Sequence, residues 1–287
     1  MDRLHILGCG TPTPTRRRFG TSSVLQLGED LLMIDCGPAA THKLVKAGLW
    51  PTRIEHLFLT HHHFDHNADL PCLLLCRWDQ SIGREPVLKV FGPPPTRTVV
   101  DRLIGTRGAF VDDWKARVNE PVSQKVHSNR GGTLPRPKPH VETADIGRGP
   151  VLDTGRWRVT CAEMDHIRGS MMTLGYRIAS PGGTIVFAGD TGPCEALTRL
   201  SAGCDVLVAN CWDLQERMDA NGEAPGQTGT RDAAKMAARS GARTLILTHT
   251  GPRLCRPSDA RTALTDIARV FSGRTLFARE LMKVDLW

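Results

Sequence analysis

The chain contains a dense run of side chains that can bind metal ions. His61, His63, Asp65 and His66 fall within six residues, directly after an apolar segment at 57–59. Zinc sites use imidazole nitrogens and carboxylate oxygens about 2.0–2.2 Å from the ion. Alternate side chains of an extended segment point the same way, so His61 and His63 can face one ion while Asp65 and His66 face another. A single histidine is usually structural, but this density predicts a metal centre.

Three further candidate ligands follow apolar, strand-like segments elsewhere in the chain. His166 follows residues 159–164, Asp190 follows 185–189, and His249 follows 245–248. A rigid strand fixes the direction of the side chain at its end, as a metal site requires. We therefore expect these three residues to complete the centre.

These segments resemble the metallo-β-lactamase superfamily, in the branch that contains tRNase Z, arylsulfatase-like and phosphodiesterase-like hydrolases. The resemblance runs nearly end to end. The HxHxDH run at 61–66 is its most specific part. Shorter matching segments occur in the family's order at 7–12, 35–37, 92–93, 175–177, 189–192 and 247–249.

The resemblance implies a role for each candidate ligand. One ion would be held by His61, His63 and His166, and the other by Asp65, His66 and His249, with Asp190 bridging the two. His63, Asp65 and Asp190 are the candidate catalytic residues. Asp35 would be a buried carboxylate that orients a ligating histidine, although a turn residue before Gly37 is the alternative. Two zinc ions are expected, while manganese or iron suit the same donors.

The expected chemistry is hydrolysis by water that the metal ions activate. Such ions lower the pKa of bound water, so that a metal-bound hydroxide attacks while an ion stabilises the developing charge. No protein nucleophile is needed. Ser22 and Ser23 lie in a strand-like segment without a partner base, so a serine mechanism is not expected.

Two positions depart from the pattern of the tRNase Z-like branch. Alignment places Thr228 where that branch has a histidine near the leaving group, and Asn210 where it has an assisting glutamate. Protonation of the leaving group is typically worth ~10²–10⁴ in rate. We therefore expect substrates that leave well unaided.

The segment between the strand around residues 175–178 and Asp190 is also short. The tRNase Z enzymes usually carry a long arm there that grips tRNA, whereas this chain has only residues 178–188. Processing of tRNA is therefore less expected than hydrolysis of a small molecule.

Aromatic residues offer further candidates for the substrate side. Trp212 and Trp78 are candidates for the wall of an apolar pocket, with core packing as the alternative. His140 is a candidate to approach the site from a lid, with a surface loop as the alternative. His62 and Asn67 are expected to face away from the metals or to be structural.

The elements that must position these residues alternate between strands and helices. Strands are expected at 4–7, 23–27, 31–34, 55–59, 87–91, 158–164, 173–178, 184–187, 206–208 and 245–247. Helices are expected around Leu44, from His66 to Trp78, within 96–118, from Thr230 and at 258–271. This order predicts an α/β fold, a four-layer αββα sandwich in one domain over 1–287. The Gly-, Pro- and Arg-rich segment at about 119–150 is expected to be a loop or lid.

Composition adds general limits. The 287 residues are 40% hydrophobic and 23% charged, typical of a folded globular chain. No apolar run approaches the ~20 residues that span a bilayer, so no membrane partner is expected. The nine cysteines are an odd number without repeated spacing, which indicates reduced thiols in a cytoplasmic protein. A homodimer is implied by the resemblance only.

Three functions remain under consideration at this point. The leading one is hydrolysis of a small anionic or aromatic substrate with a good leaving group, such as an aryl sulfate or phosphate ester, an activated lactone or a chlorinated ring. The first alternative is a phosphodiesterase acting on RNA or cyclic nucleotides, which the net charge of +7 allows. The second is a non-catalytic metal-binding scaffold.

Overall fold

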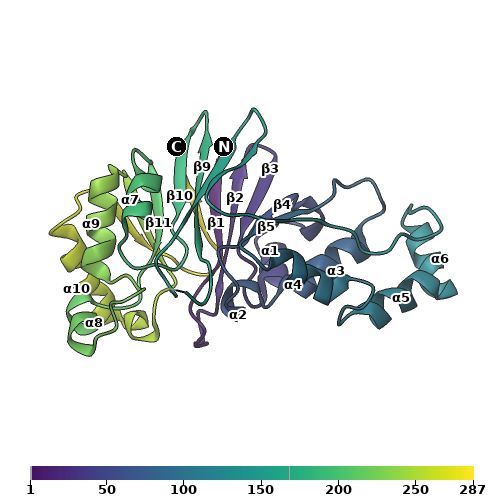
Figure 1. The fold of residues 1–287 in the computed structure, drawn as a ribbon, viewed down its shortest axis with the longest axis horizontal. Coiled ribbons are helices and arrows are strands. Elements are labelled where there is room, and N and C mark those ends of the chain that lie inside the picture. Colours follow the sequence, from purple (N-terminus) through teal and green to yellow (C-terminus); the bar gives the residue numbers. More distant parts are fainter. Residues whose placement is uncertain (1, 168) are drawn as a thin grey trace.

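A computed structural model describes residues 2–167 and 169–287. Two seven-stranded sheets pack face to face, and helices cover their outer surfaces (Figure 1). This is the four-layer αββα sandwich that the order of the elements predicts. No helix among the described residues is long and apolar enough to cross a membrane.

The first sheet is built mainly from the N-terminal half of the chain, with the last strand added at its edge. Its order is β14-β1-β2-β3-β4-β5-β6. The strands are β1 (Arg3–Cys9), β2 (Thr21–Leu27), β3 (Asp30–Ile34), β4 (His56–Phe58), β5 (Lys89–Gly92), β6 (Glu142–Asp145) and β14 (Met282–Asp285). Pairing is parallel from β3 to β6, so the carboxyl ends of these strands meet at one edge.

The second sheet contains the other half in the order β13-β12-β11-β10-β9-β8-β7. The strands are β7 (Gly149–Asp153), β8 (Arg158–Glu163), β9 (Leu174–Ser180), β10 (Gly183–Phe187), β11 (Val206–Asn210), β12 (Thr244–Thr248) and β13 (Arg274–Phe277). A tight antiparallel hairpin joins β9 to β10, and β10 to β13 are parallel. No long arm therefore leaves the chain between β9 and β10.

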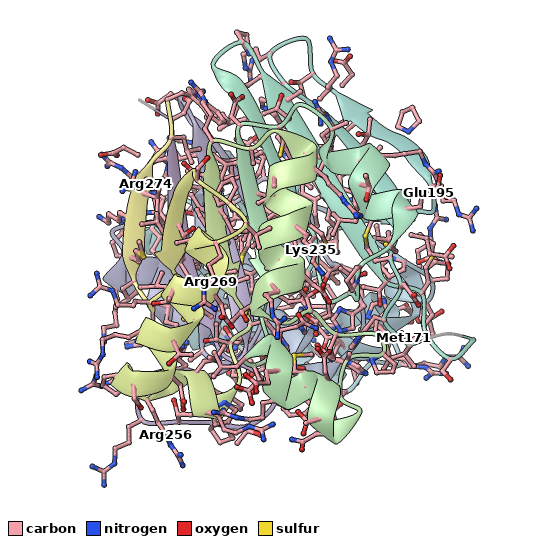
Figure 2. All side chains as sticks on the ribbon, turned by 90° about the vertical axis from the view of Figure 1, so that its left-hand side faces the viewer. Met171, Glu195, Lys235, Arg256, Arg269 and Arg274 are labelled. Carbon is pink, nitrogen blue, oxygen red and sulfur yellow. The ribbon has the colours of Figure 1, made fainter. Side chains whose placement is uncertain are left out.

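Helices lie on both outer faces. The first sheet is accompanied by α1 (Ala40–Lys46), α2 (Phe64–Asn67), α3 (Leu70–Gln80) and α4 (Thr96–Ile104), with α5 (Val111–Asn119) and α6 (Pro121–Asn129) beyond them. The second sheet carries α7 (Glu195–Ser201), α8 (Gln215–Asn221), α9 (Thr230–Ser240) and α10 (Pro257–Ala268), and α9 crosses its outer face (Figure 2). Short 3₁₀ turns occupy Pro51–Arg53 and Pro252–Cys255.

Three apolar cores correspond to the three interfaces between the four layers. The central core lies between the sheets and includes Phe58 and Tyr176, both fully buried. One outer core packs α1, α3 and α4 on the first sheet, and the other packs α7, α9 and α10 on the second. Burial of this apolar surface provides the main drive for folding.

Some expected elements differ from the structure. The segment at 119–150 is only partly loop, because it contains α6, β6 and the start of β7. The helix expected from His66 to Trp78 is broken between α2 and α3, where Asp69 leaves helical geometry. The strands β13 and β14 were not expected.

Candidate metal centre

The seven candidate ligands all follow strands, at one edge of the sandwich. His61 and His63 follow β4, while Asp65 and His66 lie on the short helix α2. The other three come from the second sheet: His166 after β8, Asp190 after β10 and His249 after β12. Residues separated by up to 188 positions in the chain are thus brought together.

Three imidazoles form the first group. The Nε2 atom of His61 lies 3.0 Å from Nδ1 of His63, and Nε2 of His166 lies 3.4 Å from the same Nδ1. Tetrahedral zinc with Zn–N distances of about 2.1 Å places its nitrogens about 3.4 Å apart. The three nitrogens therefore suit one ion.

Asp65, His66 and His249 form the second group. The Nε2 atom of His249 is 3.1 Å from Oδ2 of Asp65, and Nε2 of His66 is 3.7 Å from that oxygen. All three residues are buried. This group again suits one ion.

Asp190 lies between the two groups. Its Oδ2 atom is 3.1 Å from Nε2 of His249, 3.5 Å from Nε2 of His66 and 3.8 Å from Nε2 of His166. One carboxylate oxygen thus borders ligand atoms of both groups. This is the position that a bridging ligand requires.

Unpaired polar atoms provide a test of whether the site fits metal ions. Asp65 Oδ1 and His66 Nε2 are buried and have no hydrogen-bond partner among the described residues. Buried polar atoms are nearly always paired, so such atoms need an explanation. A set of imidazoles and carboxylates converging without other partners fits divalent cations.

Asp35 supports His66 from behind. Nδ1 of His66 donates to Oδ2 of Asp35 at 2.8 Å, and the backbone N–H of Thr60 donates to Oδ1 at 2.7 Å. Asp35 has a φ of 58°, which is uncommon for a residue other than glycine. The carboxylate is thereby fixed, and it turns Nε2 of His66 toward Asp190.

His166 is oriented by a backbone carbonyl. Its Nδ1 donates to the oxygen of Gly226 at 2.9 Å. Gly226 has a φ of +72°, and a Cβ placed there would lie 2.3 Å from the carbonyl oxygen of His166. Only glycine fits this close approach without a shift.

The pKa shifts favour the metal-binding forms of His61, His63 and Asp190. Burial lowers the pKa of His61 and of His63, which keeps both imidazoles neutral. Burial acts to raise the pKa of Asp190, but His249 and His66 outweigh it and leave this pKa well below its usual range. The neutral imidazoles and ionised carboxylate are the forms that bind metal.

Thr228 and Asn210 lie beside the bridging position. The hydroxyl of Thr228 donates to the carbonyl oxygen of Thr191 at 2.7 Å, and Nδ2 of Asn210 donates to the same oxygen at 3.1 Å. Both side chains are at most 1% exposed. The Thr228 hydroxyl and the Asn210 amide nitrogen are therefore engaged by the residue that follows Asp190, whereas Oδ1 of Asn210 has no hydrogen-bond partner among the described residues.

The aromatic candidates lie in different places. Trp212 is half-buried and donates to Glu223, which also pairs with Arg253 at 2.7 Å. Trp78 donates to the carbonyl of Pro137 on the segment after α6 and does not line the centre. His140 borders two small cavities near that segment and also lies apart from the centre.

His62 points away from the ligands. Its Nε2 lies 3.0 Å from both the carbonyl oxygen of Pro93 and the hydroxyl of Thr96. Asn67 lies 3.2 Å from its other ring nitrogen. Both side chains are therefore oriented away from the candidate ligands, one of the two expectations from the sequence.

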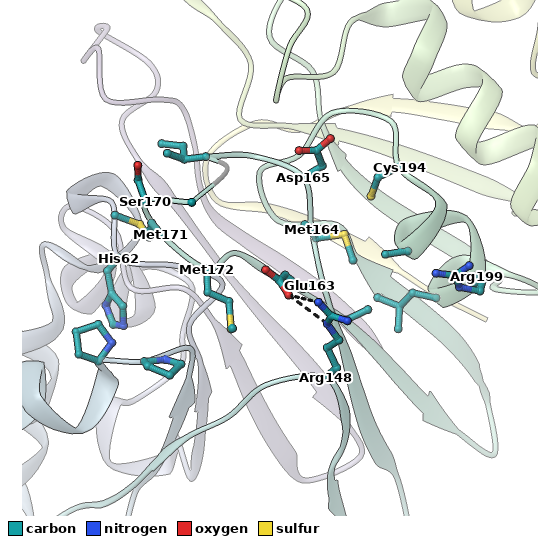
Figure 3. A pocket seen from close by; sticks show the side chains of 17 residues that line it. His62, Arg148, Glu163, Met164, Asp165, Ser170, Met171, Met172, Cys194 and Arg199 are labelled. Atoms are coloured by element: carbon teal, nitrogen blue, oxygen red, sulfur yellow. Dashed lines mark hydrogen bonds and ion pairs between the residues drawn. The ribbon is translucent and has the colours of Figure 1, made fainter.

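A groove beside the centre escaped the sequence analysis. It has a volume of about 1180 Å³ and is bordered by His62 and by Asp165 and Ile167, the neighbours of His166 (Figure 3). Its lining also includes Met164, Met171 and Met172, flexible side chains that adapt to apolar groups. The three methionines lie within nine residues of the sequence, and this clustering was the one signal that could have indicated the groove.

Comparisons with known proteins agree with this geometry. A family model described as "Beta-lactamase superfamily domain" matches residues 31–250. Ribonuclease Z of Mycobacterium bovis (strain BCG / Pasteur 1173P2) is 30% identical over 296 residues, which cover 100% of this chain and 99% of the relative. Ribonuclease Z of Mycolicibacterium paratuberculosis (strain ATCC BAA-968 / K-10) is 31% identical over 297 residues, with coverage of 100% and 99%.

Solved structures share the fold at lower identity. The metallo-β-lactamase fold protein YhfI from Bacillus subtilis superimposes with a TM-score of 0.73 at 20% identity, covering 99% of this chain and 100% of its own. The short form of human tRNase Z gives a TM-score of 0.70 at 19% identity, with 99% of each chain covered. The chain therefore belongs to the β-lactamase superfamily and is a hydrolase of the metallo-β-lactamase fold.

Proposed function

We propose that this hydrolase is a metal-dependent phosphodiesterase that acts on RNA. The observation that carries the proposal is the convergence of two ligand groups on one oxygen of Asp190. The two-ion arrangement stabilises both the attacking and the leaving oxygen of a phosphoryl displacement. Relatives named Ribonuclease Z, similar over the whole chain, support RNA as the substrate.

The side chains have distinct tasks in this proposal. When bound, two divalent ions, proposed to be zinc, would polarise a phosphoryl oxygen and activate water. His61, His63 and His166 would hold one ion, and Asp65, His66 and His249 the other. Asp35 accepts a hydrogen bond from Nδ1–H of His66, and the Gly226 carbonyl accepts one from Nδ1–H of His166, so that both Nε2 atoms would be free to bind an ion.

Hydrolysis of small aryl esters, the leading expectation from the sequence, is now the second candidate. The relatives favour the RNA alternative over it. One observation still favours good leaving groups, because Thr228 and Asn210 are both engaged with the Thr191 carbonyl and offer no imidazole or carboxyl to a leaving oxygen. The homodimer, which the resemblance implies, and the cytoplasmic location, which the cysteines indicate, remain predictions.

A hydrolysis screen separates the two candidates. The protein supplied with Zn²⁺ or Mn²⁺ is tested on an RNA hairpin with a 3′ single-stranded extension, on thymidine 5′-(p-nitrophenyl phosphate) and on p-nitrophenyl sulfate. We expect cleavage of both phosphodiesters, and loss of that cleavage in Asp190→Asn. Turnover of the sulfate alone would contradict the proposal and favour the second candidate.

A further inference from the structure

Helices α4, α5 and α6, with the segment that follows them to residue 140, form a part of the molecule that we call the helical arm (residues 96–140). In the view of Figure 1, α5 and α6 extend away from the sheets, on the side opposite α8, α9 and α10. The exposed side chains of Val122 (74%) and Val126 (43%) show that α6 is not covered by the rest of the chain.

The helical arm concentrates positive charge. It contains nine lysines and arginines against four aspartates and glutamates, an excess of five, whereas the whole chain has a net charge of +7. Six exposed cations in it form no ion pair with a carboxylate of the described residues. These are Arg97, Arg102, Arg107, Lys115, Lys125 and Lys138.

The other three cations of the helical arm anchor it to the body. Arg117, Arg130 and Arg136 all pair with the single carboxylate of Asp79 on α3, at 3.3, 3.5 and 2.9 Å. The guanidinium of Arg136 also lies 4.2 Å from the centre of the Trp78 ring, where a cation–π contact stabilises it. Trp78 thus helps to hold the helical arm on α3.

This anchor fixes the helical arm to α3, the helix that follows the run of candidate ligands. The helix α3 that carries Trp78 and Asp79 begins at Leu70, four residues after the candidate ligand His66. Cations placed on helices that are fixed in this way present a defined surface on the side of the molecule opposite α8, α9 and α10. A small ester bound at the centre is too short to contact this surface, whereas a long polyanion can contact the surface and the centre together.

We propose that the helical arm binds the phosphate backbone of the RNA whose scissile bond lies at the metal centre. This inference rests on the proposed function. Unpaired lysines and arginines bind phosphates and release counterions, which makes affinity depend on salt. The competing occupant, a second copy packed arm to arm, is disfavoured because like charges would meet.

The test measures binding of a fluorescein-labelled RNA hairpin of twelve base pairs with a 3′ extension, by anisotropy from 50 to 200 mM KCl. The arm variant is Arg107→Ala/Lys115→Ala/Lys125→Ala. The matched control is Arg231→Ala/Arg239→Ala/Arg261→Ala, which removes three exposed cations from α9 and α10 on the other side of the molecule. Each lost phosphate contact makes the negative slope of the logarithm of the association constant against the logarithm of the KCl concentration less steep by about 0.9.

We expect the steepness of this slope to decrease by about two to three in the arm variant and by less than about one in the control. Turnover of thymidine 5′-(p-nitrophenyl phosphate) should be the same in all three proteins, which keeps failure of the chemistry separate from failure of binding. An equal reduction of the salt dependence in the arm variant and in the control would overturn the inference. Absence of salt-dependent RNA binding by the unmodified protein would overturn it as well. A dimer that Val122→Asp dissociates while RNA binding is unchanged would assign the helical arm to self-association instead.

Discussion

Nδ1 of His66 lies 2.8 Å from Oδ2 of Asp35, and both side chains are only 1% exposed. Because the Asp35 carboxylate holds the proton on Nδ1, the opposite nitrogen of His66 is left free to face Asp190. Partners of this kind typically change metal affinity by 10–100-fold when they are lost. A substitution of Asp35 therefore tests whether the orientation of His66 governs metal affinity.

Replacing Asp35 with Asn should weaken metal binding by about 10–100-fold, since the charged acceptor of His66 is removed. Competition with a chelator of known affinity measures the effect. Asp112→Asn, on the exposed surface of α5, is the control and should bind metal normally. Unchanged affinity in Asp35→Asn would show that the carboxylate does not govern the ligand.

Replacing Gly226 with Ala should displace His166 and lower the metal content and the activity. The new Cβ would meet the His166 backbone at 2.3 Å, in addition to the strain of a positive φ. Gly222→Ala is a matched control, because its φ of +66° is similar and nothing lies within 4 Å of the added carbon. Equal effects of the two substitutions on metal content would rule out displacement of His166 as the cause.

Replacing Thr228 with His together with Asn210→Glu should speed the hydrolysis of phosphodiesters that have alkyl leaving groups. An added acid contributes ~10²–10⁴ in rate when the leaving group is poor, and little when it is p-nitrophenolate. Rates for alkyl and nitrophenyl diesters of one nucleotide measure the difference. Thr228→Val, which removes only the hydroxyl, should leave their ratio unchanged. If the ratio of the alkyl to the nitrophenyl rate also stayed the same in the double variant, positions 228 and 210 would not serve the leaving group.

Acid should destabilise the protein partly through His56. Burial lowers the pKa of His56 to about 4, compared with 6.5 for an unperturbed histidine. The unfolded chain therefore binds more protons between these values, and the free energy of unfolding falls as the pH drops from 6.5 toward 4. His56→Gln should lose less stability than the unmodified protein between pH 7 and pH 5 in urea denaturation. His42→Gln, at an exposed position of α1, should show the same pH dependence as the unmodified protein. If His56→Gln showed the same pH dependence of the free energy of unfolding as the unmodified protein, His56 would not contribute to that dependence.

Most strands, and the residues that converge at the site, could be predicted from the sequence because both have strong local signals. Apolar segments between Gly, Pro and Asp residues define the strands, and the run at 61–66 identifies the site. Helices were expected within 96–118, and only the part of the helical arm from about residue 119 was hidden, for a physical reason. Its Gly- and Pro-rich composition suggested a loop, although Pro121 is well suited to the first turn of α6.

Long-range contacts explain the other differences. The anchoring of Arg136 on Asp79 and Trp78 links positions 57 and 58 residues apart, which no local pattern indicates. The edge strands β13 and β14 are short and only partly buried, so their hydrophobic patterns are weak. The shared acceptor of Thr228 and Asn210 likewise depends on the folded position of Thr191.

The most direct test of the central claim is the number of metal ions per chain, measured together with turnover of thymidine 5′-(p-nitrophenyl phosphate). Elemental analysis should find two ions per chain in the active protein. Chelation should abolish turnover, and added Zn²⁺ or Mn²⁺ should restore it, because the ligand groups converge on Asp190. Fewer than one ion per chain in active protein, or full turnover after chelation, would contradict a two-ion phosphodiesterase.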